Sequence, residues 1–200
     1  MRTILISKKI KKDKYRNSNC ILENNWINYF FFFFIKLMPI NYKLFMKRDL
    51  DHLKPIGIIL AGGNDLSSII KNKENILREK NDRFLLNYGL KKKLPVLGVC
   101  YGFQFIAKKY KSKLFKVKGH VRKYHNLNFK NYKLNINSFH NYGIYKLPKN
   151  FDILAKCNDK TIELAECKKK KILCCMFHPE RHNKTQKLVN KIILKHFKIS

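Results

Sequence analysis

The segment LPVLGVCYGFQFIA, residues 94–107, is the stretch from which the fold is best read. Its first six residues form a short apolar run after three lysines, the pattern of a strand buried on both faces of a parallel sheet. Gly98 and Gly102 bracket Cys100, and the apolar residues that follow have the spacing of a packed helix. Small residues two positions before and after a sharp strand-to-helix turn are typical of a nucleophile elbow. The segment therefore predicts a buried strand that turns into a helix at Cys100.

A thiol at such a turn has a chemical advantage. The helix dipole at its N-terminus favours the thiolate, which is the reactive form, and the flanking glycines leave room for a substrate. A single cysteine between a strand and a helix also occurs as a small buried apolar residue. The choice between these interpretations of Cys100 depends on the rest of the chain.

A second motif lies near the end of the chain. The apolar run of residues 174–177 is followed at once by His178, Pro179 and Glu180. If this run lies beside the strand before Cys100, His178 emerges at the same carboxyl edge of the sheet, where open α/β folds place their sites. A thiol, an imidazole and a carboxylate in this order are the parts of an acyl-transfer triad. The pair of motifs favours a nucleophilic role for Cys100.

Three motifs together resemble the class I glutamine amidotransferase family. They are ILAGGND at residues 59–65, GVCYGFQ at residues 98–104 and FHPE at residues 177–180, and they occur in family order across nearly the whole chain. Members of this family cleave γ-glutamyl amides through a cysteinyl thioester. The resemblance implies an α/β fold of the doubly wound, flavodoxin-like kind, with a mostly parallel central sheet and flanking helices. It also implies a single domain over residues 1–200 and no cofactor.

The resemblance assigns roles to individual residues. Cys100 would be the nucleophile, His178 the general base and acid, and Glu180 the residue that positions His178. The segment NSFHN at residues 137–141 is similar to the family segment that holds the glutamyl group, although these residues would also suit a polar turn. The implied oxyanion hole is formed by Gly62, Gly63 and Tyr101, and the implied substrate-binding residues are Asn64, Gln104, Ser138, Phe139 and His140.

The sequence leaves several functions open. GGND and the N-terminal segments LENNW and MPINY are more typical of the γ-glutamyl hydrolase branch, which releases a larger amine such as γ-aminobutyrate or a nucleotide-linked amine. Tyr101 stands where many of those hydrolases carry arginine, and GVCYG is equally typical of glutaminase subunits that pass ammonia to a synthetase partner. A non-catalytic binding protein of the same fold is a third alternative. Intact Cys100, His178 and Glu180 argue against it.

The formal charge of +31 would ordinarily suggest nucleic acid as a partner. Lysine is spread over the whole length alongside abundant Asn, Ile, Phe and Tyr, a pattern that A/T-rich codons produce, and no nucleic-acid module accompanies it. We therefore expect a γ-glutamyl small molecule, not nucleic acid, as the ligand. In the basic stretch at residues 116–125, we expect His120 and His125 to be surface histidines and not metal ligands. Arg122 and its neighbouring lysines are candidates for binding a phosphate-bearing substrate.

The six cysteines show no disulfide-framework spacing, and a nucleophilic thiol suits a reducing compartment. We therefore expect a cytoplasmic protein. The apolar run at residues 29–35 is far shorter than the roughly 20 residues of a membrane-spanning helix. It predicts a core helix, and no membrane association is expected.

Further elements follow from the apolar runs and their period. Strands are expected at residues 4–6, 38–40, 56–60, 153–155, 162–165 and 172–177, and helices at residues 43–53, 74–93 and 184–197. Residues 110–151 are expected to be irregular, with short strands.

Overall fold

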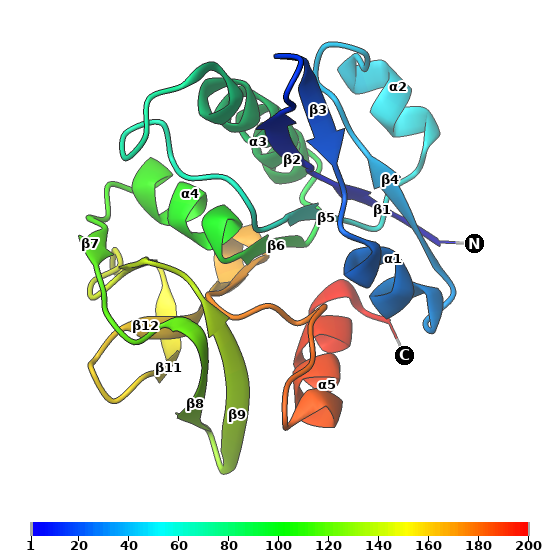
Figure 1. Ribbon diagram of the computed structural model, residues 1–200. Coiled ribbons are helices and arrows are strands. Elements are labelled where there is room, and N and C mark those ends of the chain that lie inside the picture. The colour runs from blue at the N-terminus through cyan, green and yellow to red at the C-terminus, as the bar shows by residue number, and fades with distance from the viewer. Residues whose placement is uncertain (1, 200) are drawn as a thin grey trace.

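The computed structural model describes residues 2–199 and contains a seven-stranded central sheet (Figure 1). In spatial order its strands are β11 (Asp152–Lys156), β12 (Ile162–Cys167), β13 (Ile172–Cys175), β6 (Val96–Val99), β5 (Gly57–Leu60), β1 (Arg2–Ile6) and β4 (Ile35–Pro39). The five strands from β13 to β4 are parallel, and β12 and β11 extend the sheet in antiparallel fashion. The predicted, mostly parallel sheet is confirmed.

Helices cover both faces of this sheet (Figure 1). They are α1 (Asn24–Phe31), α2 (Lys47–His52), α3 (Lys73–Lys91), α4 (Tyr101–Lys109) and α5 (Gln186–Phe197), and a short 3-10 helix spans Lys168–Lys170. Apolar residues of α1 and α5 share one core with one face of the sheet, and residues of α2, α3 and α4 share the other core with the opposite face. This is the doubly wound arrangement that the sequence predicts.

The central strands are apolar throughout because each of their faces meets a helical layer. In β1, Ile4 and Ile6 belong to the core on the α1 and α5 side, whereas Leu5 between them belongs to the opposite core. In β5, Ile59 and its neighbour Leu60 divide in the same way. Successive side chains of a strand point to opposite faces, so a strand between two cores has no position for a polar residue.

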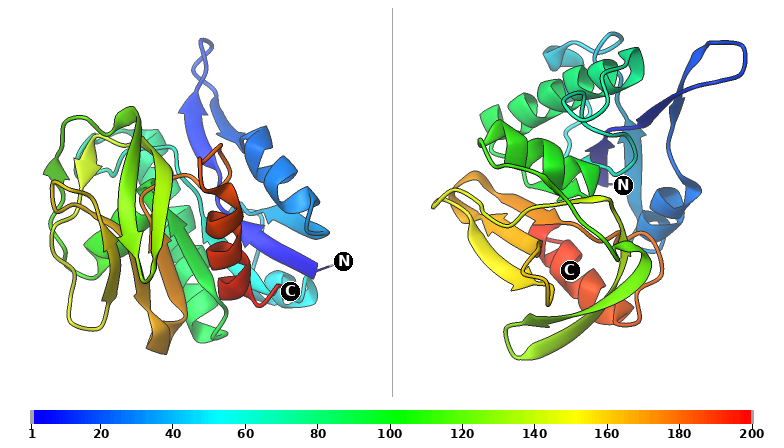
Figure 2. Two further views of the ribbon diagram at one scale, coloured as in Figure 1. Left: turned by 90° about the horizontal axis from the view of Figure 1, so that it is seen from below. Right: turned by 60° about the vertical axis from the view of Figure 1, so that its left-hand side comes forward.

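Three smaller strand pairs lie outside the central sheet: β2 (Lys9–Lys12) with β3 (Ser18–Ile21), β7 (Phe115–Lys116) with β10 (Tyr142–Gly143), and β8 (Val121–Phe129) with β9 (Tyr132–Phe139). The β2–β3 hairpin projects from the body of the molecule (Figure 2). The β8–β9 hairpin is long and packs Leu127, Leu134 and Ile136 into the core on the α5 side. The expectation of irregular structure with short strands over residues 110–151 is therefore wrong for this hairpin.

The prediction of a core helix over residues 29–35 is also wrong in its bounds. Helix α1 ends at Phe31 and β4 begins at Ile35, three residues before the expected strand. Phe31, Phe32 and Phe34 are 72%, 76% and 82% exposed, while Phe30 is fully buried. A helix of this length against a flat sheet buries a single face, so an uninterrupted aromatic run must leave part of its members in water.

The remaining expectations agree with the structure to within a few residues. The first strand, the strand ending at Leu60, the long helix α3, the β11–β12 hairpin and the closing helix α5 are all present. The helix expected at residues 43–53 is shorter, since α2 occupies only Lys47–His52. Among residues 2–199, no helix combines the length and the apolar character that crossing a membrane requires.

Candidate active site

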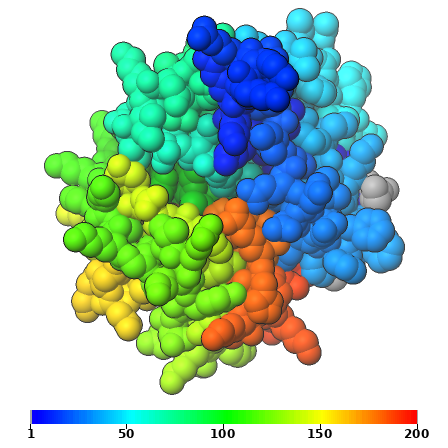
Figure 3. Space-filling view, viewed as in Figure 1, coloured from blue at the N-terminus to red at the C-terminus, as the bar shows by residue number. Residues whose placement is uncertain are grey.

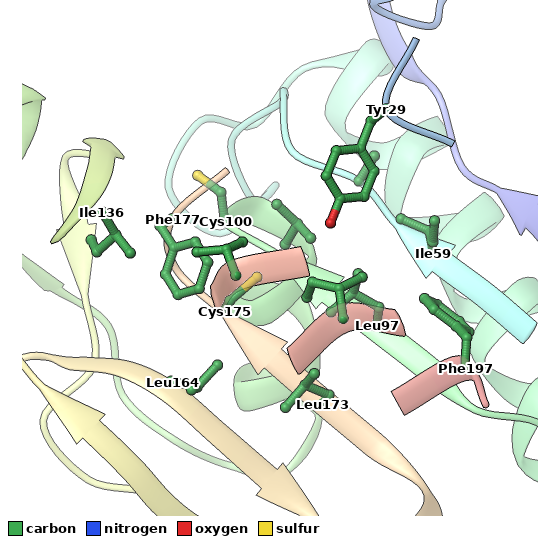
Figure 4. Close-up of a cluster of buried hydrophobic side chains, with 14 of the residues drawn as sticks. Tyr29, Ile59, Leu97, Cys100, Ile136, Leu164, Leu173, Cys175, Phe177 and Phe197 are labelled. Carbon is green, nitrogen blue, oxygen red and sulfur yellow. The ribbon is translucent and has the colours of Figure 1, made fainter. Parts of the chain in front are cut away.

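Cys100 occupies the turn between β6 and α4. Its backbone has φ of 50° and ψ of −104°, a strained conformation for a residue other than glycine, and its N–H donates to the carbonyl oxygen of Cys175 at 2.8 Å. A side chain on Gly102 would overlap the carbonyl oxygen of Leu60, so the first turn of α4 can approach β5 only with glycine there. In Figure 4 the sulfur of Cys100 points away from the centre of the apolar cluster. The chain thus forms the sharp strand-to-helix turn that its glycines predict.

His178 lies on the same edge of the sheet because β13 pairs in parallel with β6, with Cys175 opposite Val99. Asn137, at the end of β9, holds the backbone at His178 from two sides: it accepts a hydrogen bond from the His178 N–H at 2.9 Å, and its amide donates to the His178 carbonyl at 2.8 Å. The imidazole Nδ1 lies 2.7 Å from Oε1 of Glu180. Both side chains are almost fully buried.

The thiol and the imidazole shift each other's protonation. Burial disfavours a thiolate, but the charge of His178 and a hydrogen bond with it outweigh burial and hold the pKa of Cys100 below its ordinary value. Burial likewise opposes a charged imidazole, yet Glu180 and Cys100 raise the pKa of His178 to about 10. The two shifts therefore favour a thiolate beside an imidazolium over the neutral pair, and the thiolate is the nucleophilic form of a thiol.

Three other buried cysteines behave differently. Burial raises the pKa of Cys157, Cys174 and Cys175, and neighbouring carboxylates or, for Cys174, the Cys167 thiol raise it further. Cys174 and Cys175 are fully buried within the strand next to Cys100. The position of Cys100 at the strand-to-helix turn therefore distinguishes it from these cysteines as the candidate nucleophile.

Tyr101, one of the implied oxyanion-hole residues, follows Cys100 directly at the start of α4. Its backbone N–H helps to lower the pKa of the Cys100 thiol. A β-carbon on Gly62 would lie 2.6 Å from Cε1 of His178, so the loop after β5 passes directly against the imidazole. Gly63 has φ of 132°, and the aliphatic part of the Lys9 side chain packs against it. Both glycines are needed for this close approach.

A buried ion pair that sequence reasoning missed supports this loop. Arg78 and Asp82, one turn apart in α3, are fully buried and 2.9 Å apart. The Arg78 guanidinium donates to the carbonyl oxygens of Ala61 and Gly62, and it also lies over the ring of Tyr101 at 4.6 Å from the ring centre. Arg78 thus joins the two backbone segments of the implied oxyanion hole. The i, i+4 spacing of an arginine and an aspartate was the available signal, but on a lysine-rich helix it reads as a surface pair.

Replacing Arg78 with methionine is expected to lower the free energy of unfolding by about 3–5 kcal/mol, because it leaves Asp82 buried without its cation. Urea denaturation followed by circular dichroism measures this change. The matched control is Arg83→Met, an exposed arginine of the same helix, which should change stability by less than about 0.5 kcal/mol. Equal, small effects of the two substitutions would contradict the structural role of Arg78.

Of the residues assigned to substrate binding, Phe139 faces the site, whereas Gln104 and Asn64 form hydrogen bonds within the protein. Phe139 is 37% exposed and packs its ring edge against His178, with ring centres 5.9 Å apart, so it faces the site. Gln104, in α4, donates to the carbonyl oxygen of Tyr142 at 2.9 Å. Asn64 uses both amide protons within the protein, on the carbonyl oxygen of Ile10 and on Asn75. In this structure Asn64 fixes the β2–β3 hairpin over the loop after β5.

Ser138 and His140 lie deeper than the resemblance implies. Ser138 is fully buried, and its hydroxyl donates to the carbonyl oxygen of His120 at 2.7 Å. His140 is 3% exposed, and its Nε2 lies 3.2 Å from Nδ1 of His120. The expectation that His120 and His125 are surface residues is wrong, since His120 is 3% exposed and His125 is half-buried. Arg122 is exposed on β8, as a phosphate-binding candidate requires.

A narrow cleft leads to the imidazole from the N-terminal side. Its lining includes Lys9 of β2, Glu23 just before α1, Trp26 in α1, and His178 with Glu180. Arg181 closes one side, because its guanidinium binds the carboxylate of Glu23 at 3.0 Å and lies over the ring of Phe139. In Figure 3 the N-terminal segment and the segment after β13 meet on one face of the molecule. The cleft lining thus contains the cation Lys9, and Arg181 is ion-paired with Glu23 of the same lining.

An open α/β domain with a cysteine at a strand-to-helix elbow, next to a histidine and a carboxylate, has the architecture of thiol-dependent acyl-transfer enzymes. The family described as Glutamine amidotransferase class-I matches residues 29–195. The chain belongs to the class I glutamine amidotransferase family.

Named relatives fall into two kinds. The γ-glutamyl-CDP-amidate hydrolase of Campylobacter jejuni subsp. jejuni serotype O:2 is 34% identical over 148 residues, covering 73% of this chain and 72% of the relative. The A subunit of the glutamine-hydrolyzing GMP synthase of Methanocaldococcus jannaschii is 33% identical over 134 residues, covering 62% and 64%. A solved structure of a candidate GMP synthase A subunit from Thermoplasma acidophilum shares the fold, with a TM-score of 0.73, 18% identity and coverage of 99% of this chain and 94% of that one.

Proposed function

We propose that the chain is a hydrolase of γ-glutamyl amides that works through a Cys100 thioester, with His178 as general base and acid and Glu180 as its positioning carboxylate. The observation that carries this proposal is the 2.7 Å contact between Oε1 of Glu180 and Nδ1 of His178, an imidazole close enough to the elbow thiol to lower its pKa. Such an arrangement fixes the tautomer of His178 and directs its other nitrogen toward the sulfur.

The reaction proceeds in two halves. The Cys100 thiolate attacks the γ-carbonyl carbon, and the negative charge that develops on the oxygen is stabilised by the N–H of Tyr101 and by a backbone N–H of Gly62 or Gly63. The tetrahedral intermediate collapses as His178 protonates the departing amine, which leaves a γ-glutamyl thioester. His178 then removes a proton from water, and the hydroxide formed attacks the thioester carbonyl carbon. When this second intermediate collapses, glutamate is released and the Cys100 thiolate remains beside the protonated His178.

The glutamyl group would be held beside the thiol by residues of α4 and β9. Phe139 offers an exposed ring next to His178, and Gln104 lies on the helix that begins at Cys100. Ser138 and His140 would act through the position of the β9 end, because their polar atoms already have partners inside the protein. Asn64 would act in the same indirect way on the opposite wall.

We propose γ-glutamyl-CDP-amidate as the substrate, which would place the enzyme in the biosynthesis of capsule polysaccharide phosphoramidate in the cytoplasm. The similarity to the Campylobacter jejuni hydrolase supports this choice. Charge supports it as well, because Lys9 lines the cleft to His178 and Arg122 is exposed at the base of the β8–β9 hairpin. These side chains would be the partners of a pyrophosphate-bearing leaving group.

A second function, a glutaminase subunit that passes ammonia to a separate synthetase, is favoured by the similarity to the GMP synthase of Methanocaldococcus jannaschii. The two functions differ in their requirement for a partner. A glutaminase of this kind hydrolyses glutamine efficiently only when its synthetase is bound, whereas the hydrolase needs no other protein. Hydrolysis of γ-glutamyl-γ-aminobutyrate would indicate a third leaving amine.

Glutamate release from the purified protein tests the choice of substrate. We expect a kcat/KM for γ-glutamyl-CDP-amidate at least about 100-fold above that for glutamine or γ-glutamyl-γ-aminobutyrate, equivalent to roughly 2.7 kcal/mol of differential transition-state binding. Preference for glutamine, appearing only after addition of a synthetase partner such as the other subunit of a GMP synthase, would support the glutaminase function instead. The neighbouring genes provide a second criterion, because a cytidylyltransferase gene nearby favours the hydrolase.

Lys9→Ala is expected to raise KM for γ-glutamyl-CDP-amidate by roughly tenfold and to leave KM for glutamine nearly unchanged, since Lys9 would contact only the phosphate part. Steady-state kinetics with both substrates measures the difference. Lys12→Ala is the matched control, because Lys12 lies on the same strand but is exposed outside the cleft. Equal changes of KM for the two substrates would contradict the proposed contact.

The pH profile of kcat/KM follows from the two shifted pKa values. Activity is expected to fall as pH drops through the lowered pKa of Cys100, because the thiolate is protonated. It is expected to fall again as pH rises through about 10, where His178 loses the proton that the leaving amine needs. The profile should therefore be a broad bell with its acid limb below the ordinary thiol pKa. An acid limb at or above that value would contradict the thiolate–imidazolium pair.

A further inference from the structure

A second buried polar cluster lies apart from Cys100 and His178. It joins His120, just before β8, His140, just after β9, and Glu163 of β12. The three side chains are at most 2% exposed. Nδ1 of His120, Nε2 of His140 and Oε1 of Glu163 converge: the two nitrogens are 3.2 Å apart, and the carboxylate oxygen lies 3.8 Å from the first and 3.6 Å from the second.

Hydrogen-bond acceptors on the far sides of the rings fix both tautomers. Nε2 of His120 lies 2.8 Å from a carboxylate oxygen of Asp159, and Nδ1 of His140 lies 3.1 Å from the carbonyl oxygen of Tyr142. These oxygens can only accept, so the ring nitrogens facing them carry the protons. In the neutral imidazoles, the two nitrogens that face each other therefore both present lone pairs. A carboxylate oxygen is the third group aimed at the same gap.

Glu163 strengthens this argument. Its side chain is fully buried, Oε1 receives one hydrogen bond from the Thr161 hydroxyl, and Oε2 has no partner among residues 2–199. A buried carboxylate needs a compensating positive charge. Within the described part of the chain, the salt-bridge contacts of Glu163 are the two histidines, and both exceed hydrogen-bonding distance. The cluster as it stands is rich in electron pairs and short of positive charge.

We propose that His120, His140 and Glu163 bind a divalent transition-metal ion of the zinc class. Tetrahedral zinc with bonds of about 2.0–2.1 Å separates neighbouring ligand atoms by about 3.3 Å, close to the separations in this cluster. Two imidazoles and one carboxylate are a ligand set that such ions accept. The far-side bonds to Asp159 and Tyr142 match the outer-shell acceptors that orient metal-bound histidines.

The ion would have a structural role. His120 and His140 lie at the base of the β8–β9 hairpin, and Glu163 lies on β12 of the central sheet. A bound ion ties this base to the sheet. It also fixes the end of β9, where Asn137 holds the backbone of His178. Binding of a metal to the folded state alone raises the temperature of unfolding.

Three alternatives must be separated in the test: a proton in place of the metal, and metal binding at either of two other groups of side chains. Although burial opposes it, Glu163 raises the pKa of His140, so a proton could fill the gap instead of a metal. His120 also approaches His125 and Cys157, a second group whose ligand atoms lie within 4.8 Å of one another. Cys100 with His178 is a further combination of a thiol and an imidazole to which a soft metal ion could bind.

Cobalt(II) titration of the Cys100→Ala/His178→Ala protein tests the proposal, because this background removes the elbow site. The expected result is one cobalt per chain, with the visible absorption of tetrahedral Co²⁺ and an unfolding temperature raised by several degrees. Adding Glu163→Gln or His120→Gln should abolish both effects. Asp159→Asn should weaken binding about 10- to 100-fold, as loss of an outer-shell partner does.

His125→Gln and Cys157→Ser are the matched controls and should bind cobalt like the background protein. Loss of binding in these two variants but not in Glu163→Gln would overturn the proposal in favour of the second group. Absence of any cobalt absorption would overturn it in favour of the proton. If Glu163→Gln fails to fold, the background protein is compared with and without a chelator. An unfolding temperature independent of both cobalt and chelator would then contradict the site.

Discussion

Replacing Cys100 with alanine is expected to reduce kcat for γ-glutamyl amide hydrolysis by on the order of 10⁶-fold, the scale of removing a nucleophile from a triad. The substitution removes the atom that forms the thioester while leaving the elbow backbone unchanged, so the protein should fold normally. Glutamate release over a long incubation at high protein concentration measures the residual rate.

Cys20→Ala is the matched control for this variant. Cys20 is exposed on β3, and its removal should leave kcat within a factor of about two. Activity of Cys100→Ala within about 100-fold of the unmodified protein would mean that another group attacks the substrate or that water attacks directly. Either outcome would remove covalent catalysis from the account.

Replacing Glu180 with glutamine is expected to reduce kcat by about 10⁴-fold, the scale seen when the orienting carboxylate of a triad is neutralised. The charge of Glu180 helps to raise the pKa of His178, and the imidazolium in turn lowers the pKa of Cys100. Without the carboxylate both shifts shrink, so less of the thiol is ionised at neutral pH. Ultraviolet titration of the thiolate should show the pKa of Cys100 moving upward in the variant.

Glu23→Gln serves as the control for Glu180, because Glu23 lines the same cleft but binds Arg181 and not the imidazole. We expect less than about a tenfold change in kcat and no change in the thiol titration. If Glu180→Gln left the thiolate titration unchanged while activity fell, Glu180 would act on substrate binding and not through His178.

Sequence alone sufficed for the central sheet and for the proximity of the two main motifs. The runs before Cys100 and before His178 are apolar without interruption, which identifies strands covered on both faces, and parallel strands bring the residues at their carboxyl ends to one edge. Pairing of Val99 with Cys175 confirms that reasoning. Local patterns are reliable in these strands because both faces meet the same apolar surroundings.

The residues whose burial was predicted wrongly or overlooked share a physical cause, because their surroundings depend on contacts between distant parts of the chain. Arg78 and Asp82 look like a surface pair until α3 is placed against the loop after β5. His120 looks exposed in a run of cations, and the residues that bury it, among them Asp159 and Glu163, lie about forty positions further along. Phe31 to Phe34 were expected in the core because apolar character does not report how wide a buried helix face is.

The central claim is that Cys100 is the thiol that attacks the γ-carbonyl carbon of a glutamyl group. Its most direct test is peptide mapping after incubation with the diazoketone analogue of glutamine. The ketone carbon of this analogue occupies the position of the γ-carbonyl, and its diazomethyl carbon, in the place of the amide nitrogen, loses N₂ and forms a stable thioether with the thiolate. We predict one adduct per chain, on Cys100, with loss of activity in proportion to labelling and protection by excess γ-glutamyl substrate. An adduct on any of the other five cysteines, or full activity in a protein labelled at Cys100, would contradict the account.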